Sequence, residues 1–353
     1  MSKKKVLVAM SGGVDSSAAA LLLRQQGYAC DGAMLRLYSG ETEGTCCSAD
    51  DAADARSVAY SLGMKFYVFN ETERFARDVM DRFVSEYCAG RPPNPCIDCN
   101  RCLKFGALLE RALLLGYDYL ATGHYARVDF DAATQKYRLL RGRDRHKDQS
   151  YVLYMLTQEQ LAHTQFPLGA LRKAETRQLA DSLGFFNARK PDSQDICFVP
   201  DGDYAAFIRR HSGKADTPGD FVDESGRILG RHKGIAHYTI GQRKGLGIPS
   251  NQPLYVKAID SKSNQVVLSG NDALFSRQLT GENFNWIAWE APPRQFRCSA
   301  KARYRQTEQP CEVTVEENGS VQVLFDRPQR AITPGQAVVL YDGDTVLGGG
   351  TIL

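Results

Sequence analysis

Residues 5–17 read KVLVAMSGGVDSS, a short apolar run followed by two glycines, an aspartate and hydroxyl side chains. The residues that follow have helical periodicity to about residue 26, and Gly27 is a typical helix end. Adjacent glycines allow backbone amides to point at one spot, and the helix contributes its positive end. We therefore predict that this turn holds an anion, with phosphate as the obvious candidate. The alternative is a plain glycine turn in which Asp15 only caps the helix.

The loop differs from two common phosphate-binding motifs. It lacks the lysine of the Walker A pattern, and its glycines do not have the spacing of the dinucleotide-binding pattern. Outward from the loop, strand-like runs alternate with helical periodicity as far as residue 121. The predicted strands are 6–10, 30–37, 65–69 and 119–121, and the predicted helices are 16–26, 49–62, 73–87 and 104–115. This order predicts a parallel sheet covered on both faces, with ligands at the carboxyl ends of its strands.

The second part of the chain has a different pattern. After about residue 217, turns with glycine separate β-rich runs at 254–259, 265–268, 313–315, 321–325 and 337–341. We place one boundary near residue 210 and another near residue 271, where a β unit with both tryptophans begins. The predicted units are 1–210, 211–270 and 271–353, of which only the first is α/β.

Composition limits the class of protein. A chain of 353 residues, 43% apolar and 24% charged, can bury the cores of two or three domains. No apolar run approaches the roughly 20 residues of a membrane span, and the amino terminus lacks a signal-peptide core, so we expect a cytoplasmic protein with no membrane partner. Thiols stay reduced in that compartment. The ten cysteines therefore point to metal binding or catalysis rather than to a disulfide framework.

Basic residues are grouped although the net charge is only +3. The groups are Arg141, Arg143, Arg145 and Lys147; Arg231, Lys233, Arg243 and Lys244; and Arg294, Arg297, Lys301, Arg303 and Arg305. Together they could follow a phosphate backbone, and from charge alone solvated surfaces are an equally good interpretation.

Seven segments resemble known proteins. The loop 11–16, SGGVDS, resembles the PP-loop of ATP pyrophosphatases, which cleave ATP between the α and β phosphates and transfer AMP to an oxygen. Six more segments are similar to the bacterial tRNA-specific 2-thiouridylase family: 93–100, 121–125, 147–151, 192–198, 238–247 and 331–336. The resemblance implies an α/β fold with a doubly wound, Rossmann-like PP-loop domain, a small central β-rich domain and a C-terminal β-barrel. The last two would bind tRNA.

The implied activity is ATP-dependent 2-thiolation of the wobble uridine in tRNAs for lysine, glutamate and glutamine. The uracil C2 oxygen is a poor leaving group until it attacks the α-phosphate of ATP, and sulfur can then displace AMP. That sulfur must be a persulfide or sulfide held by a low-pKa thiolate. Cys99 meets this requirement, because a helix start and a nearby cation both lower the pKa of a thiol. It precedes a helix predicted from about Arg101, and Lys104 follows one turn later. The resemblance makes Cys99 the nucleophile and Cys197 the persulfide carrier, with a transient disulfide between them.

The sequence departs from the commonest family pattern at Cys96. Many members have an aspartate there, and the substitution creates Cys96-x-x-Cys99-x-x-Cys102, a spacing often used by iron–sulfur ligands. One hypothesis is therefore a [4Fe–4S] cluster held by Cys96, Cys99 and Cys197, with an open iron for sulfide. The alternatives are a plain dithiol site and a structural zinc. Of the other thiols, Cys30, Cys46, Cys47, Cys298 and Cys311 are interpreted as core or surface residues, and the roles of Cys88 and Cys102 stay open.

The resemblance also assigns binding residues. Those for ATP are Ala9, Met10, Ser11, Gly12, Gly13, Val14, Asp15, Ser16, Leu35 and Gly123. Magnesium is expected at the leaving pyrophosphate, with Asp15 as one ligand. The target base of the tRNA must leave its stack in the anticodon loop before it can react. The residues assigned to binding the anticodon stem-loop are Asn94, Pro95, Cys96, His124, Lys147, Asp148, Gln149, Arg303, Tyr304 and Gln336. The sulfur donor would be a cysteine desulfurase, a relay protein or free sulfide.

Two other functions compete with this interpretation. A lysidine synthetase or GMP synthetase would use the same loop, but neither needs two distant reactive cysteines. A metal-carrying RNA-binding protein without turnover would explain the cysteines and the basic groups, but it gives no reason for the glycine loop.

Overall fold

The computed structural model describes residues 3–38, 49–182 and 196–353. Its first unit is a five-stranded sheet in the order β3-β2-β1-β4-β7, with every neighbouring pair parallel. The strands are β1 (Lys5–Ala9), β2 (Ala29–Arg36), β3 (Phe66–Asn70), β4 (Tyr119–Ala121) and β7 (Thr164–Gln165). The helices are α1 (Val14–Gln25), α2 (Ala49–Ser61), α3 (Thr72–Phe75), α4 (Arg82–Cys88), α5 (Pro95–Asp98), α6 (Leu109–Leu114), α7 (Gln158–Ala162), α8 (Lys173–Ser182) and α9 (Tyr204–Ser212). Helical segments η1 (Ala76–Asp81), η2 (Cys99–Leu108) and η3 (Ser150–Leu153) join them.

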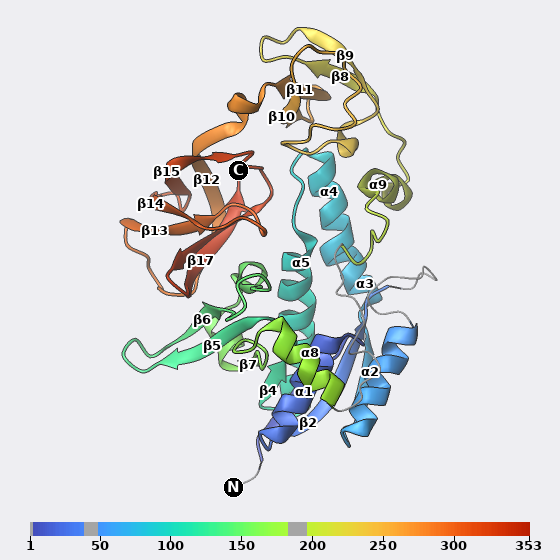
Figure 1. Cartoon of the computed structure of the whole chain (residues 1–353), viewed down its shortest axis with the longest axis vertical. Coiled ribbons are helices and arrows are strands. Elements are labelled where there is room, and N and C mark those ends of the chain that lie inside the picture. Colours follow the sequence, from blue (N-terminus) through green and yellow to red (C-terminus); the bar gives the residue numbers. More distant parts are fainter. Residues whose placement is uncertain (1–2, 39–48, 183–195) are drawn as a thin grey trace.

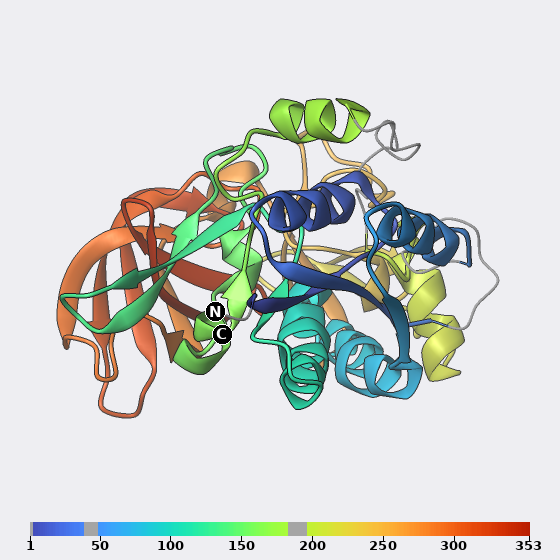
Figure 2. The same ribbon diagram turned by 90° about the horizontal axis from the view of Figure 1, so that it is seen from below.

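The predicted parallel sheet is confirmed, and β1 shows why it forms. Val6 and Val8 belong to the core shared with α1 and α2, whereas Leu7 belongs to the core shared with the helices from α3 to α6. Successive side chains of a strand point to opposite faces, so an apolar run such as β1 needs cover on both sides. Figure 2 shows this arrangement, with α1 and α8 on one side of the sheet and the segments coloured cyan and teal on the other.

The helix that carries Cys99 begins earlier than the sequence analysis expected. The segments α5, η2 and α6 form one continuous helical run, so Cys99 lies inside it and not before a helix that starts near residue 101. Its first turn is set by Asn94, whose Oδ1 accepts a hydrogen bond of 3.1 Å from the amide of Cys96, and by Pro95 in the first position. Asparagine as cap followed by proline is a regular helix start. That signal was overlooked in the motif of residues 93–100.

The C-terminal unit is a closed six-stranded barrel, as expected. Its order is β12-β15-β14-β13-β16-β17, and β17 pairs with β12 to close it. The strands are β12 (Phe275–Trp286), β13 (Gln295–Lys301), β14 (Gln309–Val315), β15 (Val321–Arg330), β16 (Ala337–Asp342) and β17 (Thr345–Ile352). An antiparallel hairpin from the first unit, β5 (Ala126–Asp131) and β6 (Lys136–Arg141), continues this sheet through the pair Thr345–Leu140.

The central unit is a small four-stranded sheet in the order β10-β11-β8-β9. Its strands are β8 (Gly219–Val222), β9 (Ile228–His232), β10 (Tyr255–Asp260) and β11 (Gln265–Ser269), with short helical turns η5 (Ile235–His237) and η6 (Asn271–Leu274). In Figure 1 the helices α4 and α5 of the first unit lie in the middle of the molecule, with the central unit above them and the barrel to their left. No helix among the described residues is long and apolar enough to cross a membrane.

Candidate functional site

The glycine loop joins the carboxyl end of β1 to the amino end of α1. Gly12 has φ +75°, and a Cβ at this position would lie 2.5 Å from the carbonyl oxygen of Asp51 in α2. Gly13 is the cap residue of α1, and no side chain caps the helix there. The Ser16 hydroxyl accepts a 3.2 Å hydrogen bond from the amide of Ser11 and donates one of 3.1 Å to the carbonyl of Gly13. Among the described residues, the first amides of α1 therefore have no side-chain cap, which is an arrangement that can bind anions.

Asp15 lies in the first turn of α1 but does not cap it. Both of its carboxylate oxygens accept hydrogen bonds of 2.8 Å from the ammonium of Lys173, at the start of α8. The hydroxyl of Tyr125 donates to Oδ1 at 2.9 Å and lies 3.0 Å from Oγ1 of Thr176. Asp15 therefore does not act as the helix cap, and the binding of an anion by the turn stays a prediction. Neither partner of Asp15 was predicted from the sequence. Lys173 is 158 residues away in the chain. Tyr125 belongs to the motif 121–125, in which only its neighbours Gly123 and His124 were assigned a role.

The magnesium role expected for Asp15 does not fit this arrangement. A divalent ion bound to its carboxylate would displace the ammonium of Lys173 from both oxygens. Asp15 is therefore not assigned as a magnesium ligand.

The other residues predicted for ATP lie around the same strand ends. Gly123 follows β4, and a Cβ there would be 2.9 Å from the backbone of both Asp15 and Ser16. The absence of a side chain lets this turn pack directly on the first turn of α1. Met10 donates its amide to the carbonyl of Ala33 at 2.8 Å, and Leu35 is buried near the carboxyl end of β2. The structure thus gathers residues 9–16, Leu35 and Gly123 at the carboxyl edge of the sheet.

Cys96 and Cys99 lie at the start of the run formed by α5 and η2. Cys96 is exposed and Cys99 is half-buried. Between them, Asp98 is buried and accepts a 2.7 Å hydrogen bond from Arg101, with Nε of Arg82 at 3.4 Å. Burial raises the pKa of the Asp98 carboxyl, against the opposing effect of the two arginines. The run leads into β4, so its amino end lies at the carboxyl edge of the sheet, as the glycine loop does.

Cys197 borders the same hydrophobic core as Cys99. The adjacent Phe198 packs edge-on against Phe75 at 5.7 Å and Phe83 at 5.3 Å, ring centroid to ring centroid. These two rings belong to α3 and α4, whose helical run packs beside η2. The first part of the motif 192–198, residues 192–195, lies outside the described residues, as do Cys46 and Cys47.

The barrel meets the cysteine segment directly. The side-chain amide of Gln336 donates to the carbonyl of Pro92 at 2.6 Å, and a Cβ at Gly335 would lie 2.5 Å from the carbonyl oxygen of Arg91. The ring of Tyr304 lies 5.8 Å from that of Tyr151, centroid to centroid. Burial raises the pKa of Tyr304 to about 12, and negative charge on Asp148 and Cys96 adds to the shift. Two residues predicted to bind RNA, Tyr304 and Gln336, are therefore at the edge of the predicted base-binding segment.

Four other residues predicted to contact RNA have side chains engaged within the protein. The guanidinium of Arg303 donates to the carbonyls of Ile240 and Ala331 and, at 2.6 Å, to Thr333, which joins the central unit to the barrel. Nδ1 of His124 lies 2.7 Å from Oγ1 of Thr122. The carboxylate of buried Asp148 accepts hydrogen bonds from the amides of Gly142 and Ser150. The side-chain oxygen of Gln149 accepts one from the amide of Tyr125. Burial lowers the pKa of His124 well below its usual value, so the ring is neutral. Their RNA roles, like that of Lys147, stay predictions.

Two of the grouped basic residues lie in an interface rather than on the surface. Arg141 is buried, stacks 4.0 Å from the ring centroid of Tyr341 and pairs with Glu308. Lys301 is also buried, with its ammonium 4.0 Å from Asp148. These cations join the first unit to the barrel and are not presented to a phosphate backbone.

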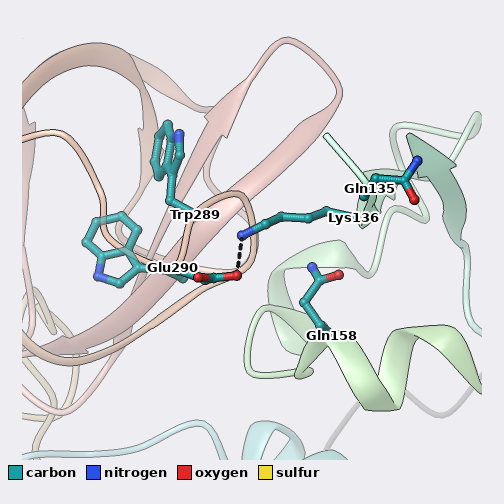
Figure 3. Close-up of a pocket in the computed structure, with 6 residues that line it drawn as sticks. Gln135, Lys136, Gln158, Trp289 and Glu290 are labelled. Carbon is teal, nitrogen blue, oxygen red and sulfur yellow. Dashed lines mark ion pairs between the residues drawn. The ribbon is translucent and has the colours of Figure 1, made fainter. Parts of the chain in front are cut away.

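A surface pocket lies between the β5–β6 hairpin and the barrel, away from the loop and the cysteines. Figure 3 shows Lys136 reaching across to Glu290, at 3.6 Å, beside Trp289 and Gln158. The amide of Gln158 donates to the carbonyls of Tyr137 and Ile287, so it fastens the hairpin to the barrel. None of the residues predicted for the site lines this pocket.

Comparison with known proteins assigns the family. Three family models match consecutive parts of the chain: a tRNA methyl transferase HUP domain at 4–201, a tRNA methyl transferase PRC-barrel domain at 205–270 and an aminomethyltransferase beta-barrel domain at 276–352. The tRNA-specific 2-thiouridylase MnmA of Acetivibrio thermocellus is 49% identical, with 100% of both chains covered. The chain belongs to the bacterial tRNA-specific 2-thiouridylase family. A second family member, MnmA 1 of Thermoanaerobacter sp., is 51% identical over 99% of this chain and 97% of its own.

Among solved structures, the U34-tRNA thiolase NcsA of Methanococcus maripaludis with its [4Fe-4S] cluster has a TM-score of 0.36 and 17% identity, over 60% of this chain and 69% of its own. A likeness at that level says nothing about cofactors in this member of the 2-thiouridylase family. Cys96, Cys99 and Cys197 do not form a metal-holding group among the residues described. The iron–sulfur cluster therefore stays a prediction, as does the plain dithiol site.

Proposed function

We propose that this chain is an ATP-dependent sulfurtransferase that converts the wobble uridine of tRNAs for lysine, glutamate and glutamine to 2-thiouridine. The observation that carries the proposal is its likeness, over the full length and at about half identity, to proteins named tRNA-specific 2-thiouridylases. The site supports it, because the glycine loop at Gly12 and Gly13 and the segment with Cys96 and Cys99 both lie at the carboxyl edge of one sheet.

The glycine loop would hold ATP and the cysteines would supply sulfur. The C2 oxygen of uracil attacks the α-phosphorus, and the bond to the β-phosphate oxygen breaks, which releases pyrophosphate. The terminal sulfur of a Cys197 persulfide then attacks C2, and AMP leaves with the former carbonyl oxygen. The thiolate of Cys99 attacks the inner sulfur of Cys197, so the electron pair of the S–S bond stays with the sulfur on uracil. A cellular thiol must then reduce the Cys99–Cys197 disulfide before the next turnover.

The contacts of the barrel give the RNA a place beside this chemistry. Gln336 and Tyr304 lie next to residues 91–96, so an anticodon loop bound on the barrel would reach the exposed Cys96 and its neighbours Asn94 and Pro95. We assign adenylation and thiol chemistry to residues 1–210 and tRNA binding to 211–270 and 271–353. A cysteine desulfurase or a relay protein would transfer a persulfide sulfur to Cys197. Free sulfide would load Cys197 only by attacking the Cys99–Cys197 disulfide, so that Cys99 leaves as a thiolate. The reaction would take place in the cytoplasm.

The test is mass spectrometry of the anticodon nucleosides after incubation of the protein with tRNA, ATP, a reducing thiol and a persulfide donor, namely a cysteine desulfurase with cysteine. We expect 2-thiouridine together with AMP and pyrophosphate in the wild type, and at least a hundredfold less product with Cys99→Ser and with Cys197→Ser. Cys88→Ser is the matched control, because this exposed thiol ends α4 outside the proposed chemistry. Thiolation without cleavage of ATP would contradict the proposal. RNA binding without any pyrophosphate release would favour a binding protein without turnover.

A further inference from the structure

The glycine loop lacks the lysine that a Walker A loop contains, yet the fold brings a lysine to the same place. The ammonium of Lys173 lies 2.8 Å from both carboxylate oxygens of Asp15, and Asp15 is in the first turn of the helix that begins at the loop. The Lys173 side chain is only 11% exposed, so this cation is held inside the protein next to the proposed phosphate site.

The position of Lys173 is fixed independently of Asp15. Its own amide donates to Oδ2 of Asp144 at 3.0 Å, and the preceding amide of Arg172 donates to Glu175 at 2.6 Å, which together set the start of α8. Leu179 of α8 packs on the buried alanines of α1. The ammonium therefore reaches the loop because two helices pack side by side, and its place does not depend on a bound nucleotide.

The charge balance of the loop gives this lysine a purpose. An aspartate in the first turn would repel a polyphosphate bound to the helix amides, because like charges close together are unfavourable. Lys173 neutralises that aspartate, and Tyr125 fixes the same carboxylate from the other side with a 2.9 Å hydrogen bond. With Asp15 neutralised, a polyphosphate at the loop meets backbone amides and a net charge near zero instead of an unpaired carboxylate. A buried ammonium beside the site is also a cation that a phosphate oxygen can share.

We propose that Lys173 is the phosphate-positioning residue of this site and supplies from α8 the cation that the loop itself lacks. In the nucleotide-free chain its ammonium pairs with Asp15. When ATP occupies the loop, the same ammonium offsets the negative charge of the phosphates and keeps Asp15 turned away from them. This inference rests on the proposed binding of ATP at the glycine loop.

The test compares binding of ATP and of adenosine by isothermal titration calorimetry in the wild type, Lys173→Met and Lys173→Arg. We expect Lys173→Met to weaken ATP binding at least tenfold and adenosine binding less than twofold, because only ATP carries the phosphates. Lys173→Arg should recover part of the loss. Lys4→Met is the control for loss of a lysine–aspartate pair away from the loop: Lys4 forms an exposed 2.9 Å pair with Asp118 at the opposite end of β1, and its loss should leave both affinities within twofold.

Each other result is decisive. Equal affinity of the wild type and Lys173→Met for ATP would overturn the inference. So would a parallel loss of ATP and adenosine binding together with a lower melting temperature, because that pattern means that Lys173 only holds α8 against α1. Failure of the wild type itself to bind ATP would instead refute the proposed function, and it is recognised without any variant.

Discussion

The two adjacent glycines of the loop are expected to respond in opposite ways to the same change, alanine. Gly12 needs its missing side chain for the fold, since its φ is +75° and a Cβ would lie 2.5 Å from the Asp51 carbonyl oxygen and 2.9 Å from the Asp51 Cα. Gly13 has φ −88° and ψ 164°, which alanine adopts freely. Among the described residues, the nearest atom to a Cβ at Gly13 is Ser11 Oγ at 3.7 Å, which is an ordinary contact.

The magnitudes follow from these contacts. A left-handed alanine costs about 1 kcal/mol, and forcing a methyl against a backbone that cannot rotate away costs about 2 kcal/mol more. Gly12→Ala should therefore lower the unfolding free energy by about 3 kcal/mol, or the melting temperature of the first unit by about 6–12 °C. Gly13→Ala should change stability by less than about 0.5 kcal/mol. Its methyl, however, stands beside the uncapped amides where phosphate is proposed, so ATP binding should weaken at least tenfold.

Thermal unfolding by circular dichroism and titration calorimetry with ATP measure the two effects separately. The reasoning is refuted if Gly13→Ala binds ATP as tightly as the wild type, because the amides then hold no phosphate. It is also refuted if Gly12→Ala melts at the wild-type temperature, because the close approach to α2 would then not constrain the loop.

Three further predictions concern the residues around the site. Burial raises the pKa of Asp98 above its ordinary value of 3.8, so the folded chain holds that proton more tightly than the unfolded chain does. The stability that Asp98 contributes is therefore lost as the pH rises from 3.8 through the raised pKa of the folded state. Denaturant titrations at several pH values should show this loss in the wild type and not in Asp98→Asn. Arg141→Met should cost about 3 kcal/mol because it breaks a buried pair, whereas Arg138→Met, which breaks an exposed 2.7 Å pair on the same strand, should cost less than about 1 kcal/mol in urea unfolding. Because the proposed route uses two thiols and a persulfide, iron and acid-labile sulfide assays on protein purified without oxygen should find no stoichiometric cluster, and a full cluster that Cys96→Ser removes would contradict that route.

The elements that were predicted well are those whose signal is local. The run around Leu7 is apolar at every position and is followed by Gly12 and Gly13, so the strand, turn and helix could be placed to within about two residues. The start of the cysteine-bearing run was misplaced because the cap at Asn94 was taken for part of a binding motif. Asn94 belongs both to the helix cap and to the predicted binding motif, and its hydrogen bond with the amide of Cys96 is what identifies it as the cap.

The contacts that sequence reasoning missed are long-range. The pairing of Lys173 with Asp15 depends on how α8 packs on α1, and nothing in the periodicity of residues 173–182 indicates it. The hairpin that extends the barrel was missed because its strands are rich in charged residues, such as Arg127, Arg138 and Asp129, that pair with each other or with the barrel. The grouped arginines near residue 141 fitted a phosphate-binding surface and solvated surfaces equally well in the sequence, and neither interpretation foresaw that part of their charge pairs within that interface.

The pairing of the β5–β6 hairpin with the last strand has a consequence for synthesis on the ribosome. Arg127 and its partner Asp344 are 217 residues apart, and at 5–20 residues per second the hairpin emerges about 10–40 s before the strand that completes its sheet. During that interval the outer edge of β6 has its unpaired amides and carbonyls open to any other extended chain. We therefore expect chaperones that cover exposed strand edges to raise the yield of this protein during synthesis, independently of the stability of the finished molecule.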